Sequence, residues 1–209
     1  LGVIYSLDSD NPLKGKIINT TIKDGLAWST DTSAKRGATT NGDGLGGANM
    51  VVITALTDWA TKYPAFEWVD SLNGDGTTYS SGAQDVWYIP SFWEAREVYC
   101  GASGLKLAVV GAGTDYDAGY VENWSTSDYN TTIQDGATYI ANRATFVERI
   151  KAVSGDTMLF DGGLLWSSTE VGATNAYGIW TNGAKQGSQS KTKTGSVQTC
   201  AIMMFDLSK

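Results

Sequence analysis

The side chains that perform most enzyme chemistry are poorly represented in this sequence. It contains no histidine, which excludes a Ser-His-Asp or Cys-His arrangement and a histidine metal site. It also lacks a GxSxG elbow and a P-loop, and the glycine-rich segment 42–46 does not follow the apolar strand that a dinucleotide site requires. We therefore expect a protein that is not an enzyme and that uses no cofactor.

Paired carboxylates are the remaining catalytic possibility, and Glu94 and Glu97 form the clearest pair. The segment 91–100 follows Pro90 and has helical spacing, with Ser91 as the N-cap and Glu94 completing a capping box. A helix start normally lowers the pKa of a carboxyl group, whereas a general acid needs a raised one. We interpret Glu94 as a cap and Glu97 as a solvated side chain, and a carboxylate-pair glycosidase remains an alternative.

Two loops carry oxygen ligands at spacings that can be compared with calcium sites. Asn73, Asp75 and Gly76 match the third, fifth and sixth positions of an EF-hand loop. Ser71, however, stands at the first position, and Gly82 stands at the twelfth, where a bidentate Glu is expected. A second loop holds a looser group, namely Asp115, Asp117 and Glu122. We expect a metal-free fold.

The two cysteines, Cys100 and Cys200, belong to no CxxC motif, so neither a metal site nor a redox site is indicated. A disulfide between them would close a long loop and stabilise the fold by roughly 4 to 5 kcal/mol. Alternatively, each is a separate buried thiol that packs as a small apolar side chain. Both alternatives stay open, because the sequence does not show whether the Cα atoms approach within about 7 Å.

Length and composition indicate one folded domain over residues 1–209. Hydrophobic residues make up 42% of the chain, with 8 Trp and 10 Tyr, which argues against disorder. The net charge of −7 and the lack of a Lys or Arg run argue against nucleic acid or an anionic membrane as the partner. No apolar run reaches the ~20 residues of a membrane-spanning helix. Because the chain starts at Leu1 and shows no signal peptide, we expect a mature or trimmed protein.

Apolar periodicity predicts the elements of the N-terminal part. Short β-like runs separated by turn residues should form the first hairpin, at 3–7, 16–22 and 26–29. One amphipathic helix is expected over 48–63, where Pro64 ends it, and a short helical piece should follow at 65–72.

Residues 103–138 are interpreted as an insertion. Its polar centre, 111–135, contains the aromatic residues Tyr116, Tyr120, Trp124 and Tyr129. Rings among small polar residues can form a binding rim, or they can anchor a long loop onto the domain, and both alternatives remain. The following segment, 139–153, predicts a helix with Arg143 and Arg149 outward. Its inward face should carry Ile140, Ala144, Val147 and Ile150.

Three apolar runs near the C-terminus, at 164–170, 175–183 and 197–205, predict neighbouring antiparallel strands with a long polar loop before the last one. Closure of the domain should pair the last run with residues 3–7. No catalytic group is evident in these runs, so we expect them to build and display a surface.

Alternation in the middle run sets the direction of its side chains. Period two points Tyr177, Ile179 and Thr181 inward and places Gly178 and Trp180 on the outer face. An outward Trp beside small polar residues is suited to anchor a ligand, because Trp is enriched at binding hot spots. With the opposite phase, Trp180 would belong to the core.

The same runs resemble a known family. Trp166-Ser167-Ser168-Thr169-Glu170, Asn175-Ala176-Tyr177 and Asn182-Gly183 resemble the WSSTE … NAW … NG ending of C-type-lectin-like domains in bacterial surface proteins. Trp87-Tyr88-Ile89-Pro90-Ser91 looks like the WYLPS segment that enters the second helix of those domains. The resemblance implies an α+β, C-type-lectin-like fold with mixed antiparallel sheets and two or three flanking helices. It also implies export, because such domains occur in Bacteroidales pilus-tip adhesins and in variable proteins of diversity-generating retroelements.

We therefore expect an extracellular, adhesin-like ligand-binding domain at a bacterial cell surface or pilus tip. Its partner would be a protein or glycan on another cell, with a pilus subunit or an N-terminal partner domain as a further partner. The alternative is a structural pilin or scaffold subunit. A donor-strand pilin should carry an exchangeable terminal strand, whereas the last run of this chain looks integral to its own core.

The expected ligand face surrounds the middle run. We expect it to tolerate replacement, and to be open to diversification by a retroelement, over 171–174, at Gly178 and Trp180, and over 184–193, because residues 187–196 are almost wholly small and polar. The ligand-binding residues expected are Val171, Gly172, Ala173, Thr174, Gly178, Trp180, Ala184, Gln186, Ser188, Gln189 and Lys191.

Overall fold

The structure is a computed structural model that describes residues 1–104, 106–108, 120–122, 137–155, 161–182 and 186–209. Most of the predicted insertion lies outside these residues, and so do Asp115, Asp117, Ala184 and three of the four aromatic residues of the insertion, Tyr116, Trp124 and Tyr129. Within the described part the fold is α+β, with two larger sheets and five helices. No helix in the described part is long and apolar enough to cross a bilayer.

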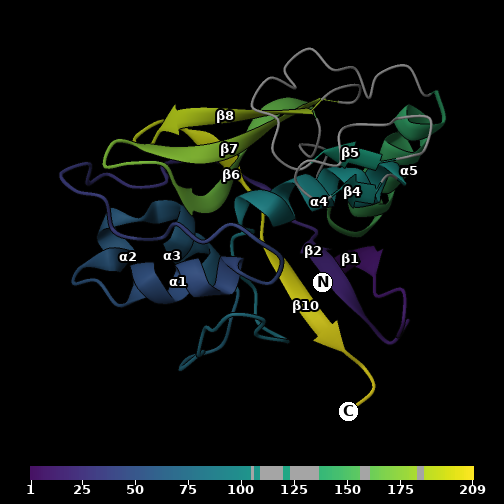
Figure 1. The fold of residues 1–209 in the computed structure, drawn as a ribbon, viewed down its shortest axis with the longest axis horizontal. Helices are drawn as coiled ribbons and strands as arrows, with labels where there is room; N and C mark the ends of the chain where they lie inside the picture. The colour runs from purple at the N-terminus through teal and green to yellow at the C-terminus, as the bar shows by residue number, and fades with distance from the viewer. Residues whose placement is uncertain (105, 109–119, 123–136, 156–160, 183–185) are drawn as a thin grey trace.

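The first sheet has three antiparallel strands in the order β1 (Gly2–Leu7), β2 (Lys14–Asn19) and β10 (Ile202–Asp206). The predicted pairing of residues 3–7 with the C-terminal strand is wrong, because β2 lies between them and pairs with both. The central strand buries Ile18 completely. Both ends of the chain nevertheless belong to one sheet, as the predicted closure requires (Figure 1).

The second sheet has the order β3 (Lys23–Leu26), β9 (Val197–Thr199), β6 (Asp161–Glu170), β7 (Asn175–Asn182) and β8 (Gln186–Thr192). Strands β6, β7 and β8 are antiparallel, and β9 runs parallel to β6. A short parallel pair, β4 (Lys106–Ala108) and β5 (Tyr120–Glu122), is separate from both larger sheets.

Two sequence-based predictions about these strands are wrong. The supposed polar loop after β7 contains β8, whose backbone pairs with β7 over seven residue pairs. Strand β8 lies at the end of its sheet, where small polar side chains suffice, so its sequence lacks the apolar alternation used for the prediction. The final apolar run splits at Cys200-Ala201 into β9 and β10, which belong to different sheets.

The helices of the N-terminal part are α1 (Gly46–Thr54), α2 (Trp59–Lys62) and α3 (Pro64–Asp70). The prediction of a single helix over 48–63 is wrong, because the helix is interrupted between α1 and α2. Asp58, which precedes α2, has a left-handed φ of 58°. Pro64 begins α3 at a position where its missing N–H is not needed, and α3 corresponds to the predicted short helix.

The other two helices are α4 (Phe92–Ser103) and α5 (Ala137–Ser154). The capping box predicted for α4 is confirmed, with the Ser91 side chain accepting from the Glu94 backbone N–H. The prediction that Arg143 points outward is wrong, because its guanidinium is buried. It lies 4.7 Å from the centroid of the Tyr99 ring and donates to Ser103 Oγ at 2.8 Å. Arg143 shares a stripe with the buried Phe146 and Ile150, while Ala144, predicted inward, is exposed.

One aromatic cluster packs the start of α3 against Trp28, which follows β3. The rings of Trp28, Tyr63 and Phe66 meet edge to face with centroids 4.9 to 6.0 Å apart.

Cys100 and Cys200 are both free and buried, so the disulfide alternative is wrong and the buried-thiol alternative is confirmed. Burial raises the pKa of each thiol to about 12, which makes both side chains poor nucleophiles.

Candidate ligand face and its buried support

The end of β6 carries the WSSTE motif, and the motif is buried rather than displayed. Ser167, Ser168 and Thr169 bond to three different segments of the chain. Ser167 Oγ donates to Tyr177 O at 2.8 Å in β7, and Thr169 Oγ1 donates to Thr40 O at 2.9 Å. Ser168 N donates to Pro90 O at 2.8 Å. The motif therefore joins the hairpin to the loop before α1 and to the start of α4.

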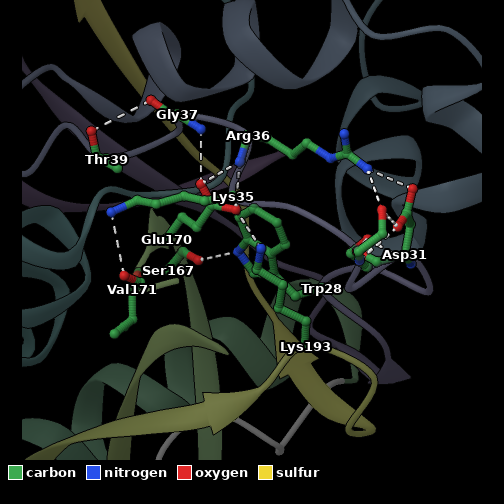
Figure 2. Close-up of polar contacts among 12 residues, drawn as sticks. Trp28, Asp31, Lys35, Arg36, Gly37, Thr39, Ser167, Glu170, Val171 and Lys193 are labelled. Atoms are coloured by element: carbon green, nitrogen blue, oxygen red, sulfur yellow. Dashed lines mark hydrogen bonds and ion pairs between the residues drawn. The ribbon is translucent and has the colours of Figure 1, made fainter. Parts of the chain in front are cut away.

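Glu170 ends β6 and forms a buried ion pair with Lys193, which follows β8 (Figure 2). Both side chains are 0% exposed. The Lys193 ammonium lies 4.6 Å from the centroid of the Trp28 ring, and Trp28 Nε1 donates to Ser167 O at 2.9 Å. Burial lowers the pKa of Lys193, although the bond to Glu170 acts in the opposite direction.

The loop before α1 supplies the other partners of Glu170. The backbone N–H groups of Arg36 and Gly37 each donate to the Glu170 carboxylate at 2.8 Å. Gly37 has a φ of 95°, which glycine adopts without strain. A carboxylate with these donors and a lysine has partners on several sides, so the buried charge is compensated. The side chain of Arg36 extends away to Asp31, with a separation of 2.6 Å (Figure 2).

Residues 171–174 form the turn between β6 and β7, directly after Glu170. The backbone N–H groups of Val171 and Gly172 donate to Asn175 O at 3.0 Å, and Lys193 N donates to Thr174 O at 2.9 Å. The side chain of Thr174 is exposed, whereas Val171, Gly172 and Ala173 are half-buried. The turn is therefore fixed by its backbone, and the Glu170–Lys193 pair lies at its base.

The hairpin register places the predicted residues of β7 and β8. Ile179 is buried and the Tyr177 ring lies 4.8 Å from the Phe92 ring, so the inward direction of both is confirmed. Gly178 is on the opposite face but is buried, and a Cβ there would lie 2.9 Å from Leu164 Cγ and from Leu165 O. The prediction that Gly178 is an exposed, replaceable ligand residue is therefore wrong.

The remaining predicted ligand residues are only partly described. Trp180 pairs with Gly187 and with Leu164 through the backbone, but its side chain lies outside the described residues. The same holds for the side chains of Gln186, Ser188 and Gln189 in β8. Lys191 is half-buried and Ser190 is exposed. Lys193, which was included in the replaceable range 184–193, is instead buried and structural.

A second buried carboxylate, Glu94, organises the start of α4. It accepts from Gly44 N, Gly46 N and Ser91 N at 3.0 Å each, and from Tyr88 Oη at 2.8 Å. A Cβ on Gly46 would lie 2.4 Å from Ile89 O, so the glycine-rich loop 42–46 is needed for close backbone approach.

Lys16 of β2 connects this carboxylate with Glu97 and Asp43. Its ammonium bonds to Glu97 and Asp43 and lies 4.0 Å from Glu94 Oε1. Burial alone would lower the pKa of Lys16, but the three carboxylates outweigh burial and raise it. The Glu97 side chain is only 20% exposed and is ion-paired, so the prediction that it is solvated is wrong.

Within the described residues, no group of three or more acidic or Cys side chains could hold a metal ion. Asn73 of the EF-hand-like segment uses its amide within the fold, where Oδ1 accepts from Trp87 N at 2.8 Å and Nδ2 donates to Trp87 O at 2.9 Å.

Sequence reasoning missed the Glu170–Lys193 pair and the loop at Arg36 that encloses it. The sequence offered one signal, a single Glu at the end of an apolar strand. The residues around Lys193 show no apolar pattern, so nothing in the sequence marked this lysine as buried.

Comparisons with known proteins bear on the fold. No known protein-family profile matches the chain, and no curated protein sequence matches it. A solved structure of a fimbrial protein from Bacteroides ovatus ATCC 8483 is similar over 91% of this chain, with 16% identity and a TM-score of 0.52. This chain spans 36% of that fimbrial protein. At this identity the likeness shows a shared fold, namely an α+β arrangement that also occurs in part of a fimbrial protein.

Proposed function

We propose that this chain is the ligand-binding domain of a surface or pilus-associated protein, built on a C-type-lectin-like scaffold. The observation that carries the proposal is the fixed backbone of turn 171–174, which rests on the fully buried Glu170–Lys193 pair. Side chains on such a turn can change at little cost to the core. The fold shared with part of a fimbrial protein supports the surface or pilus setting.

The proposed ligand face combines the turn with the hairpin behind it. It consists of Val171–Thr174, Trp180 and residues 184–191. Gly178 is left out because a Cβ there would meet Leu164, and Lys193 is left out because its side chain is buried against Glu170. The C-terminus lies at the opposite end of the molecule from β8 (Figure 1). A domain attached through that end would point the hairpin away from its attachment, as display of a ligand face requires.

The binding test uses one exposed residue of the face and one exposed residue elsewhere. The hairpin variant, Thr174→Arg, adds a bulky cation to the turn, and Thr57→Arg adds one between α1 and α2. Wild type and both variants are applied to arrays of extracellular proteins. We expect the hairpin variant to lose the wild-type signals and Thr57→Arg to keep them. Equal signals for the two variants would reject the proposed face.

Diversification of this face by a retroelement is part of the proposal and has its own test. Among isolates, substitutions that trace to template adenines should fall at 171–174, 180 and 184–191. Gly178 and Lys193 should be spared, because a Cβ at Gly178 meets Leu164 and Lys193 neutralises a buried carboxylate. Changes scattered evenly over the gene would remove the idea of diversification while leaving ligand binding in place.

The second candidate is a structural pilin or scaffold subunit, which the fimbrial neighbour also favours. An exchangeable terminal strand would be released without unfolding. Strand β10, however, pairs with β2 on one side and is held on the other by Tyr88 N to Ile202 O and Asp85 N to Met204 O, at 2.9 and 2.8 Å. We expect deletion of residues 200–209 to unfold the domain. A folded, soluble remnant, seen by its NMR spectrum, would favour the pilin.

A further inference from the structure

A polar groove lies on the helical side of the molecule, where α1, α2 and α3 meet the loop 71–79. Its volume is about 480 Å³, which is within the range of small-ligand sites. Its lining includes Trp59 of α2, Asp70 of α3, and the loop residues Gly74 and Asp75. None of the residues that line it belongs to the proposed ligand face at 171–191.

The groove has a fixed wall because Asn73 holds the loop in place. Its amide bonds to both the N–H and the carbonyl of Trp87, and it also donates to Tyr79 Oη at 3.1 Å. Tyr79 Oη in turn donates to Asp70 Oδ1 at 2.5 Å. A carboxylate can accept about four hydrogen bonds, so Asp70 keeps acceptor capacity for a ligand. Asn73 therefore builds the wall of the groove.

The chemistry of the lining selects the ligand class. Trp59 is half-buried and offers an apolar ring, while Asp70 and Asp75 are the charged residues of the lining and both are acidic. Acidic walls repel anions, and carboxylates accept hydrogen bonds from hydroxyl groups. A sugar ring presents C–H groups on its faces and hydroxyl groups at its edge, which matches an aromatic ring beside carboxylates.

We propose that this groove binds a neutral saccharide, with Trp59 against one face of the sugar and with Asp70 and Asp75 accepting from its hydroxyl groups. The site is independent of the proposed ligand face and stands or falls separately from it. Gly74 and Gly76 add no side chain to the lining, and a Cβ at either position would meet no atom within 4 Å. A saccharide can therefore approach the loop backbone closely.

Two matched glycine substitutions separate the groove from the hairpin. Gly74→Val adds bulk to the groove, and Gly172→Val adds the same bulk to turn 171–174. At both positions the added Cβ meets open space, and neither glycine has a left-handed φ, so both variants should fold. Asp75→Ala, an exposed loop change, removes one proposed acceptor. Trp59→Ala is avoided because Trp59 also packs against the core.

The probes are immobilised neutral glycans ending in glucose, galactose, mannose or N-acetylglucosamine, followed by NMR titration with the free sugar that binds. We expect millimolar binding that shifts the amide signals of Gly74 and Gly76. Gly74→Val and Asp75→Ala should each weaken binding by about tenfold or more, and Gly172→Val should leave it unchanged. Absence of binding to every probe, or equal loss in Gly74→Val and Gly172→Val, would overturn the proposal.

Discussion

Two buried carboxylates, Glu170 and Glu94, each stand beside a lysine, but their surroundings differ. Glu170 and Lys193 are both 0% exposed and form a closed pair capped by two backbone N–H groups. Glu94 is equally buried, yet its lysine, Lys16, is shared with other acids, including Asp43, whose side chain is 63% exposed. One site is a closed pair beneath a turn, and the other is a network that reaches solvent.

The pKa values of the two lysines show what this difference does. At Lys193, desolvation and the charge of Arg36 lower the pKa more than Glu170 and Asp31 raise it, whereas at Lys16 three carboxylates outweigh desolvation and raise the pKa. The charges around each buried lysine therefore set the direction in which its pKa moves. The closed pair therefore depends on both partners being present together, and the network can lose one member more easily.

The largest expected effect comes from breaking the closed pair. Lys193→Met leaves Glu170 buried without a cation, and we expect a loss of about 3 to 5 kcal/mol in the free energy of unfolding. Lys16→Met should cost less, because Glu94 keeps its four hydrogen-bond donors and Asp43 is open to solvent. Urea unfolding of both variants measures the difference.

A double variant completes this test. Glu170→Gln with Lys193→Met removes both charges and keeps an amide oxygen that can accept from the N–H groups of Arg36 and Gly37, so it should recover much of the stability lost by Lys193→Met alone. If the double variant is less stable than the single one by the full cost of Glu170→Gln, the two residues are not coupled. That result would remove the closed pair from the account.

The next prediction concerns the network around Glu94. Glu94→Gln replaces one carboxylate oxygen by an NH₂ group. That group would face at least one of the backbone N–H groups of Gly44, Gly46 and Ser91, which donate to the carboxylate. We expect a loss of about 1 to 3 kcal/mol, because the backbone N–H group that faces the NH₂ group is left without an acceptor. Thermal unfolding monitored by circular dichroism provides the measurement. Stability equal to wild type would show that these contacts are not maintained in solution.

The two lysines should also respond oppositely to alkaline pH. Lys193 has a folded pKa below the usual 10.5, so between these values the unfolded chain binds more protons and stability rises with pH. Lys16 has a folded pKa above 10.5, so its contribution is complete below 10.5 and is lost above it. NMR titration of the side-chain Cε signals should find Lys193 deprotonating first. The reverse order would contradict the comparison.

The smallest effect concerns Asp31, beside the loop that holds Glu170. The Ser33 hydroxyl and backbone N–H, followed by the charge of Arg36, lower the pKa of Asp31 from 3.8 to about 2. Its contribution to stability is therefore present above pH 3.8 and is lost as the pH falls towards 2. Ser33→Ala should bring the pKa of Asp31 back towards 3.8, as read from its carboxyl NMR signal. An unchanged pKa would mean that the hydroxyl does not contact Asp31 in solution.

Local patterns in the sequence were sufficient for one of the two carboxylate sites. The capping box at Ser91 and Glu94 lies within one helical turn, so spacing predicted it and the structure confirms it. The pair of Glu170 and Lys193 spans a hairpin, and the loop at Arg36 and Gly37 comes from another part of the chain. Contacts of this kind depend on tertiary packing, for which a single sequence has no periodic signal.

The strand predictions failed for a related reason. Strand β8 forms because the backbone of β7 offers partners, although its own side chains are small and polar. The run at 197–205 is mostly apolar, and only the sheets around it decide that β9 and β10 separate after Thr199. The inward direction of Tyr177 and Ile179 was predictable, since period-two alternation is local, but the cover that Leu164 places over Gly178 was not.

We expect the replaceable turn 171–174 to rest on an irreplaceable buried pair, Glu170 and Lys193. Saturation mutagenesis of residues 164–196 on cell-displayed protein, scored by protease resistance, tests this relation. We expect most substitutions at Gly172, Ala173 and Thr174 to leave resistance intact, and most substitutions at Glu170 and Lys193 to abolish it. If Lys193 proves as tolerant of substitution as Thr174, the buried pair does not support the turn and the account is contradicted.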